Sequence, residues 1–525
     1  MARYVFPLLA CLFLLSTSRE PPWADAHVTY DTAVSLVDRG RLDITLDGPP
    51  YFFAVHKGKK YGIASLGNVL AMVPSYLTYK ALRHVKGLPP DPLYAFCAHL
   101  SPALLMAGAC VLFLALCRRR GASPGWAVGL TLALGLTTIC FVYARSPYAE
   151  ALQTFALVWL LERTLAQARR LTLPGMALLG LAAGVLFSSK IVYVLVLPLC
   201  AAYVVAERLR AERAAWRRLL HGCGVALAAF LPFVALALWH NWVKTGSLFH
   251  TGYEGQPDIM KGEILPALYG NTLSTGRSIF LYSPPIVLGL LGLREAWRRH
   301  RRETLLLLGI IGVVTLVSCR FRIWHGGYCW GPRYLAPLTP LLMLLALPWL
   351  PEALARGRRR VRRLALGTLL GAGLTVQLLG AAFYWDHYIR VVVAVRDQTR
   401  WSGWSEDHYA HMYYMPQFSP IRGHAWLLSH VIRDDRDLGR DPPWKELVPR
   451  RIALADTWNN LRVDWWANDW VRGRRPPLGA GITLLLLLGA GVLVPAGLLW
   501  RRLRRGEPAP AGGTADDAAA REAGA

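Results

Sequence analysis

The sequence is dominated by apolar blocks of about 16–24 residues, each long enough to cross the hydrocarbon core of a bilayer as a helix. The hydrophobic set makes up 54% of the 525 residues, and 47 glycines raise the apolar share to about 63%, against about 45–50% in a soluble domain. This excludes a soluble enzyme, a fibrous protein and a disulfide scaffold, and it predicts an all-α polytopic membrane protein with about 12 transmembrane helices. The expected spans are 4–18, 94–117, 122–143, 149–166, 173–188, 190–206, 219–243, 279–297, 304–319, 334–351, 364–386 and 478–500.

Basic residues give the chain a formal net charge of +26, and they gather in short runs beside the apolar blocks. With a cytoplasmic N-terminus, the expected spans place every run on the cytoplasmic side, as the positive-inside rule requires. The sequence therefore predicts a multi-pass protein of the bacterial inner membrane with both termini in the cytoplasm. A nucleic-acid-binding protein would gather its charge on one soluble face, so we expect membrane lipids and no nucleic acid as partners. The runs lie at 118–120, 169–170, 208–218, 294–302, 356–363 and 501–505.

The segment 63–80 is also apolar, but it carries several polar residues and a proline. If it crossed the membrane, every later basic run would move to the outer side, against the positive-inside rule. We therefore expect an interfacial amphipathic helix on the outer surface, with an apolar face of Leu66, Leu70, Val73 and Leu77. A true span with inverted topology is the alternative.

This topology divides the chain into a membrane region, an outer region, a last span and a tail. The tail is rich in Ala, Gly, Pro and acids, so we expect it to be disordered. The regions are 1–386 (multi-span membrane region, with 19–93 as its first outer loop), 387–477 (tryptophan-rich outer region), 478–505 (last transmembrane helix and basic stop) and 506–525 (cytoplasmic tail).

The outer region contains eight tryptophans, from Trp401 to Trp470. Tryptophan is enriched at membrane–water interfaces, which favours that location for these rings, with stacking on sugars as the alternative. The nine cysteines lack zinc-type spacing, and only Cys319 and Cys329 fall near one outer loop. Two free thiols are favoured there over a disulfide.

The first outer loop begins with a short helical pattern that contains Asp25 and reaches a natural stop at Gly40. Asp25 can be read as the N-cap of this helix or as a general base at the membrane surface, and spacing alone favours the cap. Residues 1–26 also imitate a cleavable signal peptide with an Ala24-Asp25-Ala26 site. We expect the first span to be retained, because cleavage after Ala26 would discard Asp25.

Two more charged residues stand at outer ends of spans. Glu150 begins the fourth span, where a carboxylate is costly unless it is paired or faces a wet cavity, and Arg145 is one possible partner. Lys190 lies just after the fifth span, where it could snorkel harmlessly or hold a lipid phosphate.

The loop 320–333 carries three arginines, Arg320, Arg322 and Arg333, on the side where the charge rule disfavours them. The planar fork of arginine suits bidentate phosphate binding, and the glycines and proline of the loop fit a tight re-entrant turn. Pairing with acids of the outer region is the alternative.

The order of these elements resembles the type C glycosyltransferase superfamily, which includes protein mannosyltransferases and lipid A aminoarabinose transferases. The resemblance runs from about residue 20 to 345. Two departures are Ala26, where many relatives have a second acid after Asp25, and Lys190, where many have arginine. The matching motifs are Asp25 with the helix to Gly40, Tyr61-Gly62 leading to Leu70 and Pro74, Tyr143-Ala144-Arg145 with Glu150-Ala151-Leu152, Asn241-Trp242 with Gly246-Ser247 and Gly252-Tyr253, Ser274-Thr275-Gly276-Arg277 with Tyr282-Ser283-Pro284-Pro285, and Gly326-Gly327 with Trp330-Gly331-Pro332-Arg333-Tyr334.

The resemblance implies transfer of a sugar from a polyprenyl-phosphate donor to an acceptor glycan, lipid or protein at the outer face of the inner membrane. Asp25 would deprotonate the acceptor hydroxyl, an inverting single displacement would follow, and Glu150 would orient the acceptor or an arginine. No cofactor is certain, and because the acidic pair is missing we assign no metal ligands, although a divalent cation stays open. The implied donor-phosphate residues are Lys190, Arg277, Arg322 and Arg333, and the implied substrate-binding residues are Tyr61, Tyr253, His325 and Trp330.

The rival interpretation is a transporter or flippase of a lipid-linked glycan. Such a protein also needs cations and aromatic residues at the outer face. It usually shows internal repeats and charged residues near mid-membrane, whereas the charges here cluster at the ends of the expected spans. The sequence therefore favours the transferase.

Overall fold

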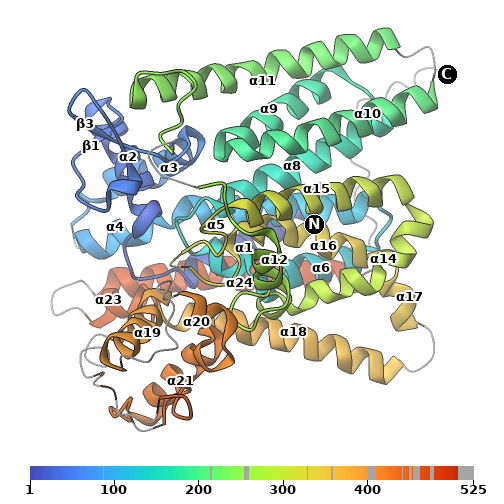
Figure 1. Ribbon diagram of the computed structural model, residues 1–525. Helices are drawn as coiled ribbons and strands as arrows, with labels where there is room; N and C mark the ends of the chain where they lie inside the picture. The colour runs from blue at the N-terminus through green and yellow to red at the C-terminus, as the bar shows by residue number, and fades with distance from the viewer. Residues whose placement is uncertain are drawn as a thin grey trace.

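The structure is a computed structural model that describes residues 1–86, 88–212, 216–253, 259–327, 329–355, 359–399, 409–439, 441–448, 452, 454, 461–472 and 478–505. Within these ranges the chain is mostly helical (Figure 1). The all-α prediction needs one correction, because the first outer loop forms a small antiparallel sheet of order β1-β3-β2. Its strands are β1 (Asp43–Ile44), β2 (Phe53–His56) and β3 (Lys59–Gly62).

Helices cover all twelve of the expected spans. Of these, six are long and apolar enough to cross a membrane and four are shorter apolar helices, within the described residues. Ten apolar helices agree with a polytopic membrane protein, but a count of twelve spans is not confirmed. The helices are α1 (Ala2–Leu15), α4 (Pro90–Ala98) with α5 (Leu100–Arg119), α6 (Pro124–Thr137) with α7 (Cys140–Ala144), α8 (Glu150–Arg169), α9 (Leu173–Ser189), η2 (Ile191–Val196) with α10 (Leu197–Ala211), α11 (Trp216–Thr245), α13 (Ile279–Tyr282), η4 (Pro284–Ile286) and α14 (Val287–Arg299), α15 (Arg301–Arg320), η5 (Arg333–Leu338) with α16 (Thr339–Ala346), α18 (Arg359–Ala382) and α24 (Leu478–Arg504).

The helix α8 matches an expected span but is not apolar enough along its length to count among the ten apolar helices. It lies in the middle of the bundle, packed against α5, α9 and α10, and most of its residues are buried. Glu162 near its end is buried and forms ion pairs with Arg119 and Arg163. A helix surrounded by protein can carry paired charges that a lipid-facing helix of the same length could not.

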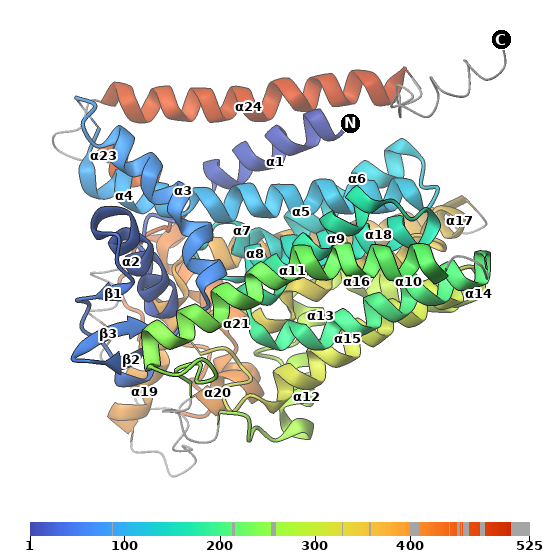
Figure 2. The same ribbon diagram turned by 90° about the horizontal axis from the view of Figure 1, so that it is seen from above.

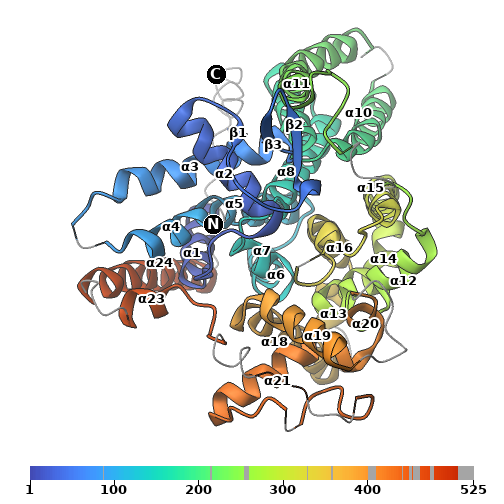
Figure 3. The ribbon, with the colours of Figure 1, turned by 60° about the vertical axis from the view of Figure 1, so that its left-hand side comes forward.

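The two ends of the bundle differ in character (Figure 2). At one end lie α2 (Ala24–Arg39), the sheet, α3 (Leu66–Leu82), α19 (Trp385–Thr399) and α23 (Ala467–Arg472). At the other end the basic turns pair with acids of neighbouring helices, as in Arg120 with Glu303 at 2.7 Å and Arg302 with Glu207 at 2.8 Å. Figure 3 turns the first end forward, with α2 and the sheet above, α18, α19 and α21 (Pro420–Arg433) below, and α7 and α16 seen between them.

The helix α3 forms as the sequence predicts. Val69 and Met72 are buried in a core shared with α2, whereas Leu70 and Leu77 are 46% and 49% exposed. Of the predicted apolar face, Leu66 therefore packs into the protein. Leu70 and Leu77 are exposed and are free to contact a membrane surface. Its position relative to the bilayer stays a prediction.

Four of the eight tryptophans of the outer region fit neither interpretation of the sequence. Trp426, Trp444, Trp466 and Trp470 are buried in the protein core rather than placed at an interface or open to a sugar. The reason is packing between distant segments: Trp466 and Trp470, for example, contact Phe96 of α4. Trp465 is 37% exposed. Trp401, Trp404 and Trp458, like the tail 506–525, lie outside the described residues.

Candidate active site

Asp25 lies in the first turn of α2, and the N-cap interpretation is wrong. The helix begins at Ala24 with Trp23 as its N-cap residue, and no side chain caps it. The Asp25 carboxylate instead accepts two hydrogen bonds from Arg333, at 2.8 Å from Nη2 to Oδ2 and 3.3 Å from Nη1 to Oδ1. This is the fork geometry that matches arginine to a carboxylate. At its other end α2 stops at Gly40, which adopts a left-handed conformation as predicted.

Glu150 is the second carboxylate beside Arg333. It is the first residue of α8, its side chain is 3% exposed, and its Oε1 lies 3.7 Å from Arg333 Nε. Arg145, which the sequence offered as its partner, pairs instead with Asp464 at 3.4 Å. The alternative in which Arg145 pairs with Glu150 is therefore excluded, because Arg145 turns toward Asp464. Arg333, conversely, pairs with acids of the first loop and α8, and with none of the acids that the structure describes in the outer region.

Aromatic rings enclose the two cations of the site. Arg333 stacks on Tyr148 and Tyr334, with its guanidinium carbon 5.0 and 5.1 Å from the ring centroids. Lys190, between α9 and η2, places its ammonium 3.9 Å from the Tyr334 ring and 4.4 Å from the Phe321 ring. Rings at such distances attract a cation through their quadrupole, so both positive charges are stabilised by the surrounding aromatic faces.

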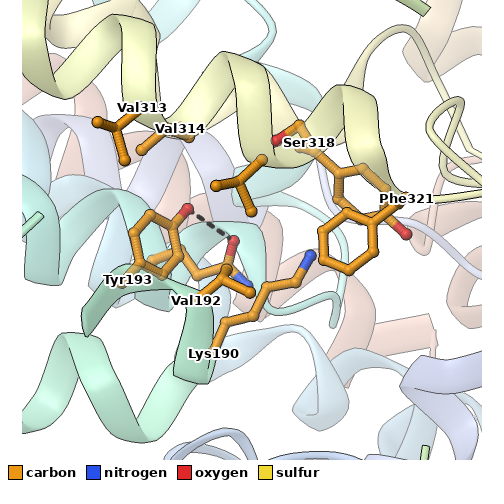
Figure 4. Close-up of a pocket in the computed structure, with 10 residues that line it drawn as sticks. Lys190, Val192, Tyr193, Val313, Val314, Ser318 and Phe321 are labelled. Carbon is orange, nitrogen blue, oxygen red and sulfur yellow. Dashed lines mark hydrogen bonds between the residues drawn. The ribbon is translucent and has the colours of Figure 1, made fainter. Parts of the chain in front are cut away.

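A small pocket lies beside Lys190, with a cavity volume of about 10 Å³ (Figure 4). Its Lys190 end is bordered by Phe321, Tyr334 and Ser318, and Figure 4 shows the lysine amine pointing toward the Phe321 ring. The rest is mainly apolar, with Val192, Val313, Val314 and Val317 facing it from η2 and α15. Among the described residues no carboxylate forms an ion pair with Lys190. The pocket thus joins a cation to an apolar surface.

Tyr253 reaches the same cluster from the loop after α11. Burial is the main cause that raises the pKa of its phenol, the charges of Tyr334 and Asp25 raise the pKa further, and Arg333 opposes them. Gly252 lets the loop pass close to the sheet: at φ +90° a Cβ there would lie 3.3 Å from both Ala54 and Ile63. The structure therefore brings Tyr253 near Asp25 and Arg333.

Arg277 does not join this cluster. Its side chain is fully buried and donates hydrogen bonds to the carbonyl oxygens of Gly327, Cys329 and Gly331, at 2.9, 2.7 and 2.7 Å. Because its Nη1 and Nη2 groups are engaged in this way, Arg277 supports the loop that leads to Arg333, and its role toward a donor phosphate stays a prediction.

The remaining residues named from the sequence are dispersed. Tyr61 lies on β3 and packs with Tyr30 in the core beneath α2 and α3. Trp330 is fully buried against Tyr282 and His424, and His325 bonds the Tyr413 hydroxyl at 2.6 Å. Arg322 is exposed, and its backbone N–H donates to Ile259.

The aromatic partners Tyr148, Tyr334 and Phe321 were not predicted from the sequence. Tyr334 directly follows Arg333 and Tyr148 stands two residues before Glu150, so proximity to the named charges was the available signal. All nine cysteines are free thiols in the structure, including Cys319 and Cys329.

The site does not fit a bound divalent cation. Within the described residues no three His, Cys, Asp or Glu side chains gather as a metal site. The two carboxylates present, Asp25 and Glu150, are both directed at the Arg333 guanidinium, which takes the place that a cation between them would need.

Over most of its length the chain is similar to solved structures at low sequence identity and with TM-scores below 0.5. One is ArnT from Cupriavidus metallidurans bound to undecaprenyl phosphate, with 17% sequence identity, a TM-score of 0.46, and coverage of 93% of this chain and 77% of that one. Another is the oligosaccharyltransferase AglB from Archaeoglobus fulgidus in complex with an inhibitory peptide and a dolichol-phosphate, with 12% identity, a TM-score of 0.44, and coverage of 80% and 60%. No family model and no curated protein sequence matches the chain.

Proposed function

We propose that the protein is a membrane glycosyltransferase that moves a sugar from a polyprenyl-phosphate donor to an acceptor hydroxyl at the outer face of the bacterial inner membrane. The observation that carries this proposal is the convergence of Asp25, Glu150, Lys190 and Arg333 from four separate parts of the chain beside an apolar pocket. A base, two cations and a lipid-compatible surface are what such a transfer requires.

The donor would lie with its lipid chain on the valine surface of η2 and α15 and its phosphate between Lys190 and Arg333. Lys190 supplies a point charge held by Phe321 and Tyr334. Arg333 supplies a planar fork, which suits the phosphate oxygens and can stabilise the charge that develops on the leaving phosphate. Because the donor already carries an activated sugar, the reaction needs no nucleotide site.

Asp25 is our candidate base. Its side chain is 42% exposed, so an acceptor can reach it, whereas Glu150 is enclosed. Arg333 has to turn from Asp25 to the incoming phosphate, and this movement leaves the carboxylate open to accept the hydroxyl proton. The alkoxide then attacks the anomeric carbon from the side opposite the phosphate, which inverts its configuration.

Glu150 and Tyr253 take supporting roles in this scheme. Glu150 lies 3.7 Å from Arg333 Nε on the side away from Asp25, so it can retain the guanidinium while the phosphate binds. Tyr253 lies where an acceptor would approach Asp25. The acceptor is a glycan, a lipid or a protein that carries a hydroxyl group.

A deletion strain and paired variants on α2 test the function. Lipid and glycan mass spectrometry would compare the deletion strain with its parent, and plasmids encoding the wild type, Asp25→Asn or Asp31→Asn would be introduced. Asp31 lies on the same helix, is half-buried, and receives the same isosteric change. We expect a sugar modification to disappear on deletion and to return with the wild type and Asp31→Asn.

The Asp25→Asn protein should insert normally but lower turnover by about two to four orders of magnitude, the usual contribution of acid–base catalysis. Full restoration by Asp25→Asn would exclude Asp25 as the base. If the deletion strain accumulates an intact lipid-linked glycan on the inner leaflet, the transporter interpretation would replace the transferase.

A further inference from the structure

The loop between α15 and η5 determines where Arg333 stands. It contains three glycines in the left-handed region, Gly326, Gly327 and Gly331, with φ of +78°, +70° and +62°. A chain bent by three such residues has little rigidity of its own, because glycine has more backbone freedom than any other residue. Its shape must therefore come from contacts with other parts of the protein.

Arg277 supplies most of these contacts. It follows α12 (Ile264–Thr272) in the chain, and its guanidinium bridges the carbonyl oxygens of Gly327, Cys329 and Gly331. Nη1 also lies 3.2 Å from Cys329 Sγ. One planar group thus fixes the directions of three peptide planes over a five-residue stretch, which a single ammonium could not do.

Gly326 is the residue of the loop that packs against the Arg333 side chain. A Cβ built on Gly326 would lie 2.8 Å from Arg333 Cγ and 3.0 Å from both Cδ and Nε. The side chain of Arg333 therefore packs directly against the backbone of Gly326, where no side chain separates the two. Gly327 differs, since a Cβ there would meet nothing within 4 Å.

The helix α20 (Tyr409–Tyr414) of the outer region packs on the side of Arg277 and contacts the loop. The Tyr413 ring covers the Arg277 guanidinium at 4.7 Å, and its hydroxyl bonds His325 Nδ1 at 2.6 Å. Gly276 makes the approach possible, because its N–H donates to Tyr413 O and a Cβ there would lie 1.8 Å from Met412 O.

We propose that Arg277, covered by Tyr413, is a positioning residue that holds the loop at Gly327, Cys329 and Gly331, so that Gly326 seats Arg333 between Asp25 and Glu150. This gives the outer region a role in forming the site, through α20. The part that concerns ligand binding rests on the proposed function, in which Arg333 holds the donor phosphate.

A matched pair of glycine variants in the purified full-length protein tests the positioning. Gly326→Ala and Gly327→Ala impose similar backbone strain at φ +78° and +70°, but only the first places a methyl group against Arg333. The midpoint temperature of unfolding is measured for each variant with and without Asp25→Asn. Displacement of Arg333 from Asp25 should abolish the effect of Asp25→Asn in the Gly326→Ala protein and preserve it in the Gly327→Ala protein.

Binding of undecaprenyl phosphate, followed by native mass spectrometry, is the second readout. We expect Gly326→Ala and Arg277→Lys to weaken binding about tenfold to a hundredfold, the scale on which a misplaced group acts. If Asp25→Asn changed the unfolding temperature equally in the two glycine variants, the positioning role would be overturned, whatever the binding data showed. Loss of coupling with unchanged binding would instead support the positioning and refute the phosphate role of Arg333, which separates the two proposals.

Discussion

At the scale of single residues, Arg333 is the centre of the site, because it contacts Asp25 and lies beside Glu150, Tyr148, Tyr334 and Gly326. Arg333→Lys retains the charge but removes the fork and the stacking plane. We expect it to lower transfer activity clearly, and Arg333→Ala to lower it further, in an assay of sugar transfer in membranes. Arg322→Lys is the matched control, since Arg322 belongs to the same loop but is exposed. Equal activity of Arg333→Lys and the wild type would reduce Arg333 to a point charge.

A second prediction concerns Asp38 on α2. Hydrogen bonds from the Lys80 ammonium and the Tyr76 hydroxyl of α3 lower the pKa of its carboxyl group. A carboxyl whose pKa is lower in the folded state contributes stability above its unfolded pKa of about 4, and this contribution is lost as the pH falls through the folded pKa. The unfolding temperature should therefore decrease below about pH 4 in the wild type and depend less on pH in Asp38→Asn. Identical pH profiles would contradict a contribution from this contact.

The residue scale also shows what the sequence could and could not predict. Asp25, Glu150, Lys190 and Arg333 were named from motifs and the charge rule, and the structure brings them together. Arg277 was named on the same grounds, but its charge is compensated by three backbone carbonyl groups. The direction of backbone carbonyl groups cannot be predicted from a motif.

At the scale of elements, the apolar blocks of the sequence predicted the helices well. Two aromatic residues that were predicted to bind substrate lie in the core instead. Trp330 and Tyr61 are large and amphipathic, which suits a sugar site and a core equally, and both are core residues here. The strands β1 to β3 were not predicted, because two to four residues are too few for an alternating pattern to appear.

Close helix packing gives a prediction for α9 and α11. A Cβ on Gly180 would lie 2.1 Å from Ala226 O, so the two helices touch through backbone at this position, as small residues allow in membranes. Gly180→Ala should destabilise the protein by about 1–3 kcal/mol through overpacking. Gly224→Ala, on α11 with nothing within 4 Å, should leave the unfolding temperature unchanged or raise it. The two would be compared by thermal unfolding in detergent, and equal effects would contradict the close contact.

At the scale of the whole molecule, the open question is which end of the bundle faces outward. We predict that the end with α2, α3 and α21 is outside, so a membrane-impermeant thiol reagent added to intact spheroplasts should label Ile432→Cys and not Arg298→Cys. Ile432 is 75% exposed on α21, and the Arg298 side chain is 69% exposed on α14. The exposed native Cys223 would first be replaced by serine. Labelling of Arg298→Cys alone would invert the topology and move the proposed reaction to the cytoplasmic face.

The contacts of Arg145 also bear on how the protein is made. Its buried guanidinium donates to Ser16 O at 2.5 Å, Ala381 O at 3.1 Å and Asp464 O at 2.6 Å, and these partners come from the beginning, the late middle and the end of the chain. During translation the early helices enter the bilayer long before residue 464 leaves the ribosome. The Arg145 guanidinium is therefore in the membrane before the Asp464 carboxylate that pairs with it. Breaking a buried ion pair costs about 3–5 kcal/mol, so a nascent chain stays incomplete near Arg145 until its last segment docks. We therefore expect the docking of residues 461–472, which bring Asp464 to Arg145, to follow the insertion of the earlier helices.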